Sequence, residues 1–266
     1  MKKKSKIILF LRYSILIAGL ITGSVIYFNF SPKVFVMGIK SDYRSKQKIE
    51  VLFIGNSYTY YNQMPDMVSA LSKVNKNSKY YIAADSVTAG GATLEMHWKN
   101  RNALNAIKKK KWDYIVIQGQ SLTMMFPQTR RSFDRYLNKF VSEIRTHSPN
   151  TRIVLFSTWQ RENGDPIYTQ MGFDYSSMLD TVQKNYYYYA NHYNLDVVYT
   201  GSYFYGANKL GIDTYHDGSH PNVLGSYIVA KLFYKKFIPD AKVSCDDINY
   251  IYGISKESCH QVARLF

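Results

Sequence analysis

Cysteine and acidic residues are scarce in this chain. Among 266 residues there are two cysteines, Cys245 and Cys259, and 19 acidic side chains face 34 basic ones. A structural zinc site takes four cysteine or histidine ligands, and these two cysteines lack the further partners that such a site needs. No cysteine lies near the amino terminus, which excludes a lipid-modified amino terminus. Internal repeats and low-complexity tracts are absent as well.

The excess of positive charge is concentrated at one end of the chain. The formal net charge is +15, and residues 1–48 hold ten of the basic residues but only one acidic residue. The one basic cluster further on, Lys108–Lys111, is interpreted as a solvated helix end. No stretch interleaves aromatic and basic residues as single-strand binding platforms do. The charge therefore indicates a membrane-flanking segment and not a nucleic-acid partner.

The amino-terminal segment has the pattern of a membrane span. An uncharged, largely apolar stretch of 18 residues, Tyr13–Phe30, follows five basic residues. That length just spans a hydrocarbon core of about 30 Å, and the preceding charges favour a cytoplasmic amino terminus. Residues 1–30 are therefore predicted to be a signal anchor, with the rest of the chain periplasmic or extracellular. Secretion after cleavage near Thr22–Ser24 is the alternative, which is disfavoured because the apolar run continues past that site.

The two cysteines lie in a carboxyl-terminal tail, residues 241–266. In an exported protein such a pair predicts a local disulfide. In a cytosolic protein the same pair would be two free thiols. The export signal favours the disulfide.

Between a polar linker, residues 31–47, and this tail, apolar runs rich in β-branched and aromatic residues alternate with longer amphipathic runs. A chain of this length suffices for one α/β domain, here residues 48–240. Five alternations predict an α/β fold, a three-layer α/β/α sandwich around a central, mainly parallel five-stranded sheet. The predicted strands are Glu50–Ile54, Tyr80–Ala84, Tyr114–Ile117, Arg152–Phe156 and Asp196–Tyr199. The predicted helices are Pro65–Val74, Leu94–Lys109, Arg131–Thr146, Tyr175–Tyr193 and Asn222–Phe237.

Function in such a sheet collects in loops beyond the carboxyl ends of the strands. The first predicted strand runs into Gly55–Ser57, which holds a serine at this edge, with the next helix expected near Met64. Taken alone the signal is weak, because glycine, asparagine and serine are ordinary turn residues.

A second segment supplies the partners that a serine nucleophile needs. A serine hydroxyl requires a base, for which imidazole is well matched, and the imidazole requires a carboxylate that fixes its tautomer. Asp217 precedes His220 by three residues, so both can point into the same crevice. Pro221 suits the first position of a following helix.

Together these segments resemble the catalytic blocks of the SGNH, or GDSL-like, hydrolase superfamily. A Gly-Asn-Ser block follows the first strand, an Asp-x-x-His-Pro block closes the domain, and the order along the chain matches. The resemblance covers roughly residues 48–237 and implies a flavodoxin-like sandwich. It also implies a catalytic triad in which Ser57 is the nucleophile, His220 the base and Asp217 the acid.

When an ester carbonyl is attacked, its oxygen becomes a negatively charged oxyanion. Members of the superfamily stabilise this oxyanion through three hydrogen-bond donors. The resemblance implies the backbone amide of Ser57 and that of Gly91, with Gly90 as the alternative. The third block departs from the usual Gly-x-Asn-Asp, and its Gln-Gly-Gln is similar to the carbohydrate acetylesterase branch. A glutamine amide can donate as an asparagine amide does, so Gln118 is the expected donor and Gln120 the alternative.

The expected activity is hydrolysis of a short acyl ester, such as acetyl, on a small molecule or glycan, through an acyl-serine intermediate. Tyr58 and Thr59 replace the leucine that often follows the nucleophile of lipolytic members, which argues against long-chain lipases. Trp159–Arg161, after the fourth strand, are candidates for the cleft wall. No metal ion or cofactor is implied, because the protein supplies nucleophile, base and donors. An extracytoplasmic O-acyltransferase with the same triad is one alternative, and a non-catalytic envelope or carbohydrate-binding protein is another.

Overall fold

A computed structural model describes residues 43–75, 77–240, 242, 244–245 and 253–266. The predicted signal anchor, residues 1–30, and most of the predicted linker lie outside the described residues. Within the described part of the chain, no helix is both long and apolar enough to cross a membrane.

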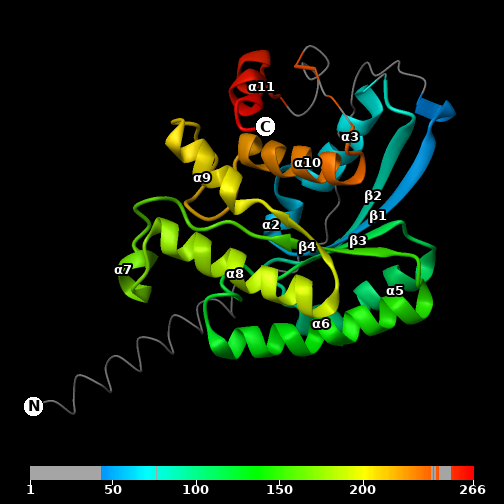
Figure 1. Ribbon diagram of the computed structural model, residues 1–266, viewed down its shortest axis with the longest axis horizontal. Coiled ribbons are helices and arrows are strands. Elements are labelled where there is room, and N and C mark those ends of the chain that lie inside the picture. The colour runs from blue at the N-terminus through cyan, green and yellow to red at the C-terminus, as the bar shows by residue number, and fades with distance from the viewer. Residues whose placement is uncertain (1–42, 76, 241, 243, 246–252) are drawn as a thin grey trace, which may run out of the picture. The chain divides into compact units, whose positions relative to one another are not determined.

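Five strands form one sheet through the middle of the described structure (Figure 1). The order is β2-β1-β3-β4-β5, and each neighbouring pair is parallel. The strands are β1 (Gln47–Gly55), β2 (Tyr80–Thr88), β3 (Tyr114–Gln118), β4 (Arg152–Ser157) and β5 (Asp196–Tyr199). All five predicted strands are present, and the parallel sheet is confirmed.

Helices cover both faces of the sheet (Figure 1). One face carries α3 (Met64–Val74), α9 (Gly201–Lys209), α10 (Val223–Phe237) and α11 (Lys256–Ala263). The opposite face carries α4 (Leu94–Asn100), α5 (Asn102–Lys109), α6 (Pro127–His147) and α8 (Tyr175–Tyr193). The predicted three-layer α/β/α arrangement is thereby confirmed.

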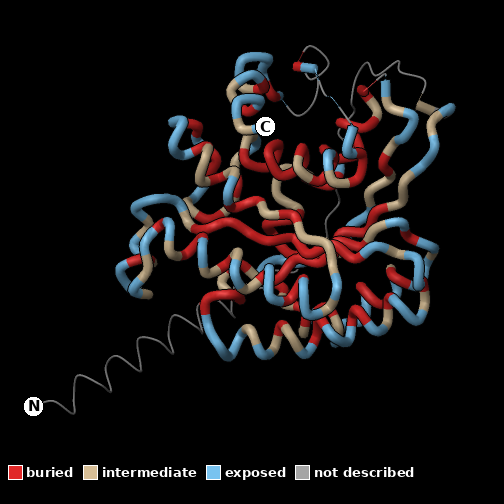
Figure 2. Tube along the Cα trace, in the orientation of Figure 1, coloured by how far each residue is buried: buried red, intermediate tan, exposed pale blue. Residues whose placement is uncertain are grey.

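Alternate side chains of each strand pack into two separate cores. In β1, Val51 and Phe53 belong to the core under α3 and α10, whereas Leu52 and Ile54 belong to the core over α5 and α6. Successive side chains of a strand point to opposite faces, so a continuous apolar run is buried on both sides. Figure 2 shows the middle of the sheet as a buried layer between helices whose outer surfaces are exposed, whereas the edge strand β2 is largely intermediate or exposed.

Several helices differ from the prediction. The run predicted as Leu94–Lys109 is divided between α4 and α5 at Arg101, which adopts a left-handed conformation with φ 62°. The short helices α2 (Ser57–Tyr60) and α7 (Ile167–Met171) were not predicted. Helices α9 and α11 were not predicted either.

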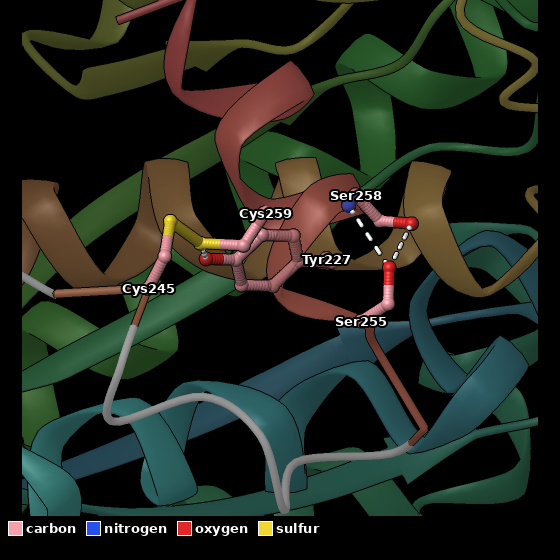
Figure 3. The surroundings of a disulfide bond; sticks show 5 residues. All are labelled: Tyr227, Cys245, Ser255, Ser258 and Cys259. Atoms are coloured by element: carbon pink, nitrogen blue, oxygen red, sulfur yellow. Dashed lines mark hydrogen bonds between the residues drawn. A yellow bond between two sulfur atoms is a disulfide. The ribbon is translucent and has the colours of Figure 1, made fainter.

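The predicted disulfide is present. Cys245 and Cys259 are bridged, with their Cα atoms 5.6 Å apart (Figure 3). Cys259 belongs to α11, whose first turn is capped by Ser255, because the Ser255 hydroxyl accepts from the Ser258 amide at 3.0 Å. The hydroxyl of Tyr227, in α10, contacts the Cys259 sulfur at 3.4 Å. The bridge therefore lies where the terminal helix packs on α10.

Removal of this bridge is expected to destabilise the protein. The cysteines are 14 residues apart, and a cross-link that closes a loop of about 15 residues restricts the unfolded chain by about 3 kcal/mol. A double Cys245→Ser, Cys259→Ser variant should lose that much unfolding free energy in urea titrations. In protein recovered from its native compartment, we expect neither thiol to react with an alkylating reagent before reduction. Alkylation of both would contradict the bridge.

Candidate active site

The site lies at the carboxyl ends of β1 and β3, in the middle of the sheet. The connection after β1 leads to β2 on one side, and the connection after β3 leads to β4 on the other. Loops diverge at such a switch point, and open parallel sheets bind ligands in the crevice between them. Ser57 and Gln120 lie in the two connections that leave this point.

The turn that presents Ser57 is tightly packed. A Cβ atom on Gly55 would lie 2.3 Å from Thr59 Oγ1 and 2.5 Å from Gln118 Oε1. Only glycine fits so close an approach. The strand can therefore turn at once into the segment that carries the nucleophile.

Ser57 is the first residue of the short helix α2, whereas the next helix after β1 was expected only near Met64. Asn56 caps α2, because its Oδ1 accepts from the Tyr58 amide at 3.1 Å. The first amides of a helix have no partner within the helix. The Ser57 amide is accordingly available to a bound oxygen atom.

Asp217 and His220 lie on a closed loop between α9 and α10. Tyr215 and Pro221 form an antiparallel bridge at the base of this loop. Asp217 Oδ1 accepts from the backbone amides of Ser219 at 3.0 Å and His220 at 2.7 Å. Asp217 Oδ2 accepts from His220 Nδ1 at 2.7 Å. Pro221 was expected at the first position of the following helix, but α10 begins at Val223. Asn222 caps the helix by accepting from the Gly225 amide at 2.9 Å.

The electrostatics of the loop determine the state of the imidazole. Burial raises the pKa of the Asp217 carboxyl, but hydrogen bonds from His220 and from the Ser219 backbone outweigh burial and hold the pKa below its usual range. The resulting carboxylate keeps a hydrogen on His220 Nδ1. His220 Nε2 then accepts from Ser57 Oγ, which lies 2.9 Å away. The structure thus brings Ser57, His220 and Asp217 into one chain of hydrogen bonds.

A stack of aromatic rings packs beneath the hydrogen-bonded residues Ser57, His220 and Asp217. Tyr58 stacks on Trp159, with ring centroids 4.3 Å apart, and Trp159 stacks on Phe204 at 4.4 Å. Trp159 Nε1 donates to the Ser219 carbonyl at 3.0 Å. Trp159 and Gln160 are fully buried, so they do not form the cleft wall that was expected. They form the floor under the Asp217 loop.

Gln118 is not placed as the expected oxyanion donor. Its Oε1 accepts from the Asn56 amide at 2.8 Å and from Thr59 Oγ1 at 2.9 Å. Its Nε2 donates to Asn56 Oδ1 at 3.0 Å and to the Gly119 carbonyl. Both amide hydrogens are therefore engaged inside the protein, and the side chain is 1% exposed. Gln118 fixes the turn before the nucleophile and has no hydrogen left for a substrate.

The other expected donors remain open to a ligand. Gly91 has φ +64°, a conformation that side-chain-bearing residues rarely adopt, and space around it. Its amide has no hydrogen-bond partner in the part of the chain that the structure describes. Gln120, the alternative third donor, is half-buried; its Nε2 donates to Ser121 Oγ at 3.2 Å and its Oε1 accepts from the Leu122 amide at 2.9 Å. One amide hydrogen of Gln120 is left for an oxyanion.

These environments predict different effects for the two glutamines. Gln120→Ala should lower kcat by about 10²- to 10³-fold, the loss typical of one oxyanion donor, with an unchanged melting temperature. Gln118→Ala leaves buried groups of Asn56 and Thr59 unpaired, so it should lower the unfolding free energy by at least about 2 kcal/mol. Steady-state kinetics and thermal unfolding of both variants would separate the roles. A stable Gln118→Ala protein with a large loss of kcat would reverse this assignment.

One residue of the turn was missed by sequence reasoning. His97, in α4, is buried, and its Nε2 lies 2.8 Å from the Gly55 carbonyl. Burial lowers the pKa of His97 and outweighs the hydrogen bond to Gly55, which favours the neutral ring with a hydrogen on Nε2. A lone histidine on the apolar face of a helix carries no motif, so its role in holding Gly55 is evident only from the fold.

No group of three or more histidine, cysteine or acidic side chains comes together as a metal site among the residues described. No model of a protein family matches the sequence. No curated protein matches it either.

Solved structures do resemble the chain. A candidate SGNH hydrolase from Slackia heliotrinireducens is 22% identical, with a TM-score of 0.58 over 72% of this chain and 100% of its own. A DUF4886 family protein from Bacteroides uniformis is 18% identical, with a TM-score of 0.65 over 82% of this chain and 94% of its own. A catalytic mutant of an acetylxylan esterase from Geobacillus stearothermophilus is 19% identical, with a TM-score of 0.54 over 72% and 94%. The chain therefore has the α/β fold of the SGNH hydrolases.

Proposed function

We propose that the protein is a serine esterase in which Ser57 attacks the ester carbonyl. The observation that carries this proposal is the continuous chain of hydrogen bonds, 2.9 Å from Ser57 Oγ to His220 Nε2 and 2.7 Å from His220 Nδ1 to Asp217 Oδ2. A serine hydroxyl needs a base at neutral pH, and the base needs an acid that fixes its tautomer. Both partners are in contact here without any rearrangement.

In the first half of the proposed reaction, Ser57 Oγ bonds to the carbonyl carbon while its proton passes to His220 Nε2. The carbonyl oxygen gains negative charge and accepts hydrogen bonds from the Ser57 and Gly91 amides and from Gln120. The tetrahedral intermediate then collapses. The imidazolium gives its proton to the departing alcohol oxygen, the carbon–oxygen bond breaks, and the acyl group stays on Ser57.

The second half uses the same groups. His220 takes a proton from water, and the water oxygen attacks the acyl carbon. The oxyanion forms again at the same donors. When the intermediate collapses, Ser57 Oγ leaves and recovers its proton from His220, and the carboxylic acid is released. Asp217 stays ionised throughout and stabilises the imidazolium.

A neighbouring cavity supports an uncharged, hydroxyl-bearing substrate. The cavity has a volume of about 300 Å³ and lies between the start of α4, the loop after β3 and the start of α6. It is lined by Thr93, Leu94, Glu95, Gln120, Thr123, Gln128, Thr129, Ser132 and Phe133. Glu95 carries the one charge of this lining, and its carboxylate accepts from Lys99 at 2.6 Å as well as from Ser132 and Tyr136. A mostly apolar lining with a few hydroxyl and amide groups is typical of small-molecule sites, and those polar groups can bind the hydroxyls of a sugar.

We therefore propose a short acyl ester of a carbohydrate, with acetyl as the first candidate, as the substrate. The likeness in fold to an acetylxylan esterase supports this choice. The test offers the full-length protein acetyl, butyryl and palmitoyl p-nitrophenyl esters and acetylated xylooligosaccharides. The acetyl esters should have the highest kcat/KM. Preference for the palmitoyl ester would contradict the substrate class.

Product analysis in excess unacylated sugar separates hydrolysis from acyl transfer. Release of acetate with an unmodified acceptor supports the hydrolase. An acetylated acceptor would indicate an O-acyltransferase with the same triad. If Ser57 fails to react with a fluorophosphonate probe, a non-catalytic carbohydrate-binding protein becomes the better interpretation.

We further propose that residues 1–30 anchor the protein in a membrane, with the folded part periplasmic or extracellular. The Cys245–Cys259 bridge supports this location, because disulfides persist in oxidising compartments. Two free thiols in native, unreduced protein would argue against it.

A further inference from the structure

The segment directly after the nucleophile has an unusual backbone. Asn62 and Gln63 both adopt the left-handed conformation, with φ 52° and φ 55°. Only four residues other than glycine do so in the described part of the chain, and these two are consecutive. Such conformations are unfavourable for residues with a side chain and persist where the surroundings enforce them. The reason for the turn lies in what it brings together.

The turn ties the nucleophile segment to the loop that carries the base. Asn62 Nδ2 donates to the Pro221 carbonyl at 3.0 Å and to Ser226 Oγ at 2.9 Å. Ser226 Oγ in turn donates to the Tyr61 carbonyl at 3.3 Å. Pro221 directly follows His220. The Asn62 amide therefore fixes the end of the catalytic loop relative to the end of α2.

The same turn also places the Tyr61 ring against the imidazole of His220. The Tyr61 ring stacks on His220, with centroids 4.3 Å apart and planes 10° from parallel. The Tyr58 ring meets His220 edge to face at 5.7 Å and 78°. The hydrogen bonds to Ser57 and Asp217 hold the two ring nitrogens, but both act in the plane of the imidazole. Contact with the Tyr61 face restrains tilting out of that plane.

We propose that Tyr61 and Asn62 are positioning residues for His220, which set its ring plane and its distance from Ser57. This inference rests on the proposed esterase function and deepens it. Both residues follow the nucleophile within five positions, so one short segment places the nucleophile and restrains the base. A displacement of reacting groups by about 1 Å can cost on the order of 100-fold in rate, which gives such restraint a measurable effect.

The first test separates the amide of Asn62 from its backbone. Glycine accepts a positive φ without strain, so Asn62→Gly removes the hydrogen bonds and keeps the turn. We expect kcat to fall between about tenfold and 100-fold, with KM within twofold of the wild-type value and no loss of melting temperature. Asn194→Gly is the matched control, since Asn194 has φ 51° at the end of α8, and it should keep full activity. Wild-type kcat in Asn62→Gly would overturn the role of Asn62.

The second test separates the ring of Tyr61 from its hydroxyl. Tyr61→Phe keeps the stacked face and should retain kcat within twofold. Tyr61→Leu removes that face and should lower kcat about tenfold, again with little change in KM. Tyr188→Leu is the control, because Tyr188 stacks on His192 at 5.8 Å and 5° in α8, and it should leave kcat unchanged. Equal rates for Tyr61→Leu and Tyr61→Phe would overturn the role of the ring.

An independent measurement distinguishes this inference from the esterase proposal. The proton shared by His220 and Asp217 should give a low-field resonance in proton NMR spectra of the wild-type protein and of Tyr61→Phe. In Asn62→Gly and Tyr61→Leu the resonance should shift or broaden, because the ring is less restrained. An active wild type with unchanged rates and resonance in these variants overturns the positioning alone. A wild type that hydrolyses no ester and does not react at Ser57 overturns both proposals.

Discussion

Ser57→Ala is expected to lower kcat/KM for ester hydrolysis by about 10⁴- to 10⁶-fold, as removal of the nucleophile does in serine hydrolases. The Ser57 hydroxyl has one partner in the described residues, His220 Nε2 at 2.9 Å, and the histidine side chain is 26% exposed. Water can replace the lost hydroxyl, so no buried group is left unpaired. The fold should therefore be kept.

The measurement combines hydrolysis of a p-nitrophenyl acetate substrate with thermal unfolding. Ser86→Ala is the matched control, because Ser86 is an exposed serine on the edge strand β2. It should retain both activity and melting temperature. Activity of Ser57→Ala within tenfold of the wild type would rule out Ser57 as the nucleophile, whatever the identity of the natural ester.

Substitution of the two partners should give graded losses. His220→Ala removes the base and should be nearly as severe as Ser57→Ala, whereas Asp217→Asn should cost about 10⁴-fold, since the acid only orients and stabilises the imidazole. The asparagine can present its NH₂ group to Nδ1, which favours the wrong tautomer. Kinetics at saturating substrate would establish the order. If Asp217→Asn left the rate unchanged, another carboxylate would have to orient His220. Asp213 is the nearest such acid in the sequence, but its carboxylate accepts from the Tyr215 amide at 3.0 Å.

The same assignment has a consequence for pH. The hydrogen bonds that lower the pKa of Asp217 keep its charge present from neutral pH down through the ordinary range of an aspartate. As the pH falls from neutrality through that range, Asp217 should therefore stay ionised and continue to orient the imidazole. Asp217→Asn should lower the plateau of the pH–rate profile at every pH at which the wild type is active.

Local pattern predicted the sheet well and the helices less well. The central strands β3 and β4 are short apolar runs, and their burial on both faces leaves little ambiguity in their type. Arg101 divides α4 from α5 by a left-handed turn. No glycine or proline occurs there to predict such a break from the sequence. The start of α2 at Ser57 depends on the Asn56 cap, which is no different in sequence from an ordinary turn asparagine.

Residues of the site that belong to a sequence motif were predicted, whereas residues whose role depends on packing contacts were missed. Ser57, Asp217 and His220 have spacing and neighbours that sequence reasoning can use, and the fold brings them together. The choice between Gln118 and Gln120 depended on which amide the protein itself occupies, and that is a property of packing. The stack of Tyr61 on His220 joins residues far apart in the chain and leaves no periodic signal.

The closeness of Gly55 to Thr59 and Gln118 bears on how this turn can evolve. A methyl group at position 55 would meet both side-chain oxygens at once, while Gln118 already satisfies the Asn56 amide. A substitution at any one of these four positions therefore alters the requirements of the other three. Related sequences should drift here by coordinated replacement, so that the turn is inherited as a unit while the loops around it diversify with the substrate.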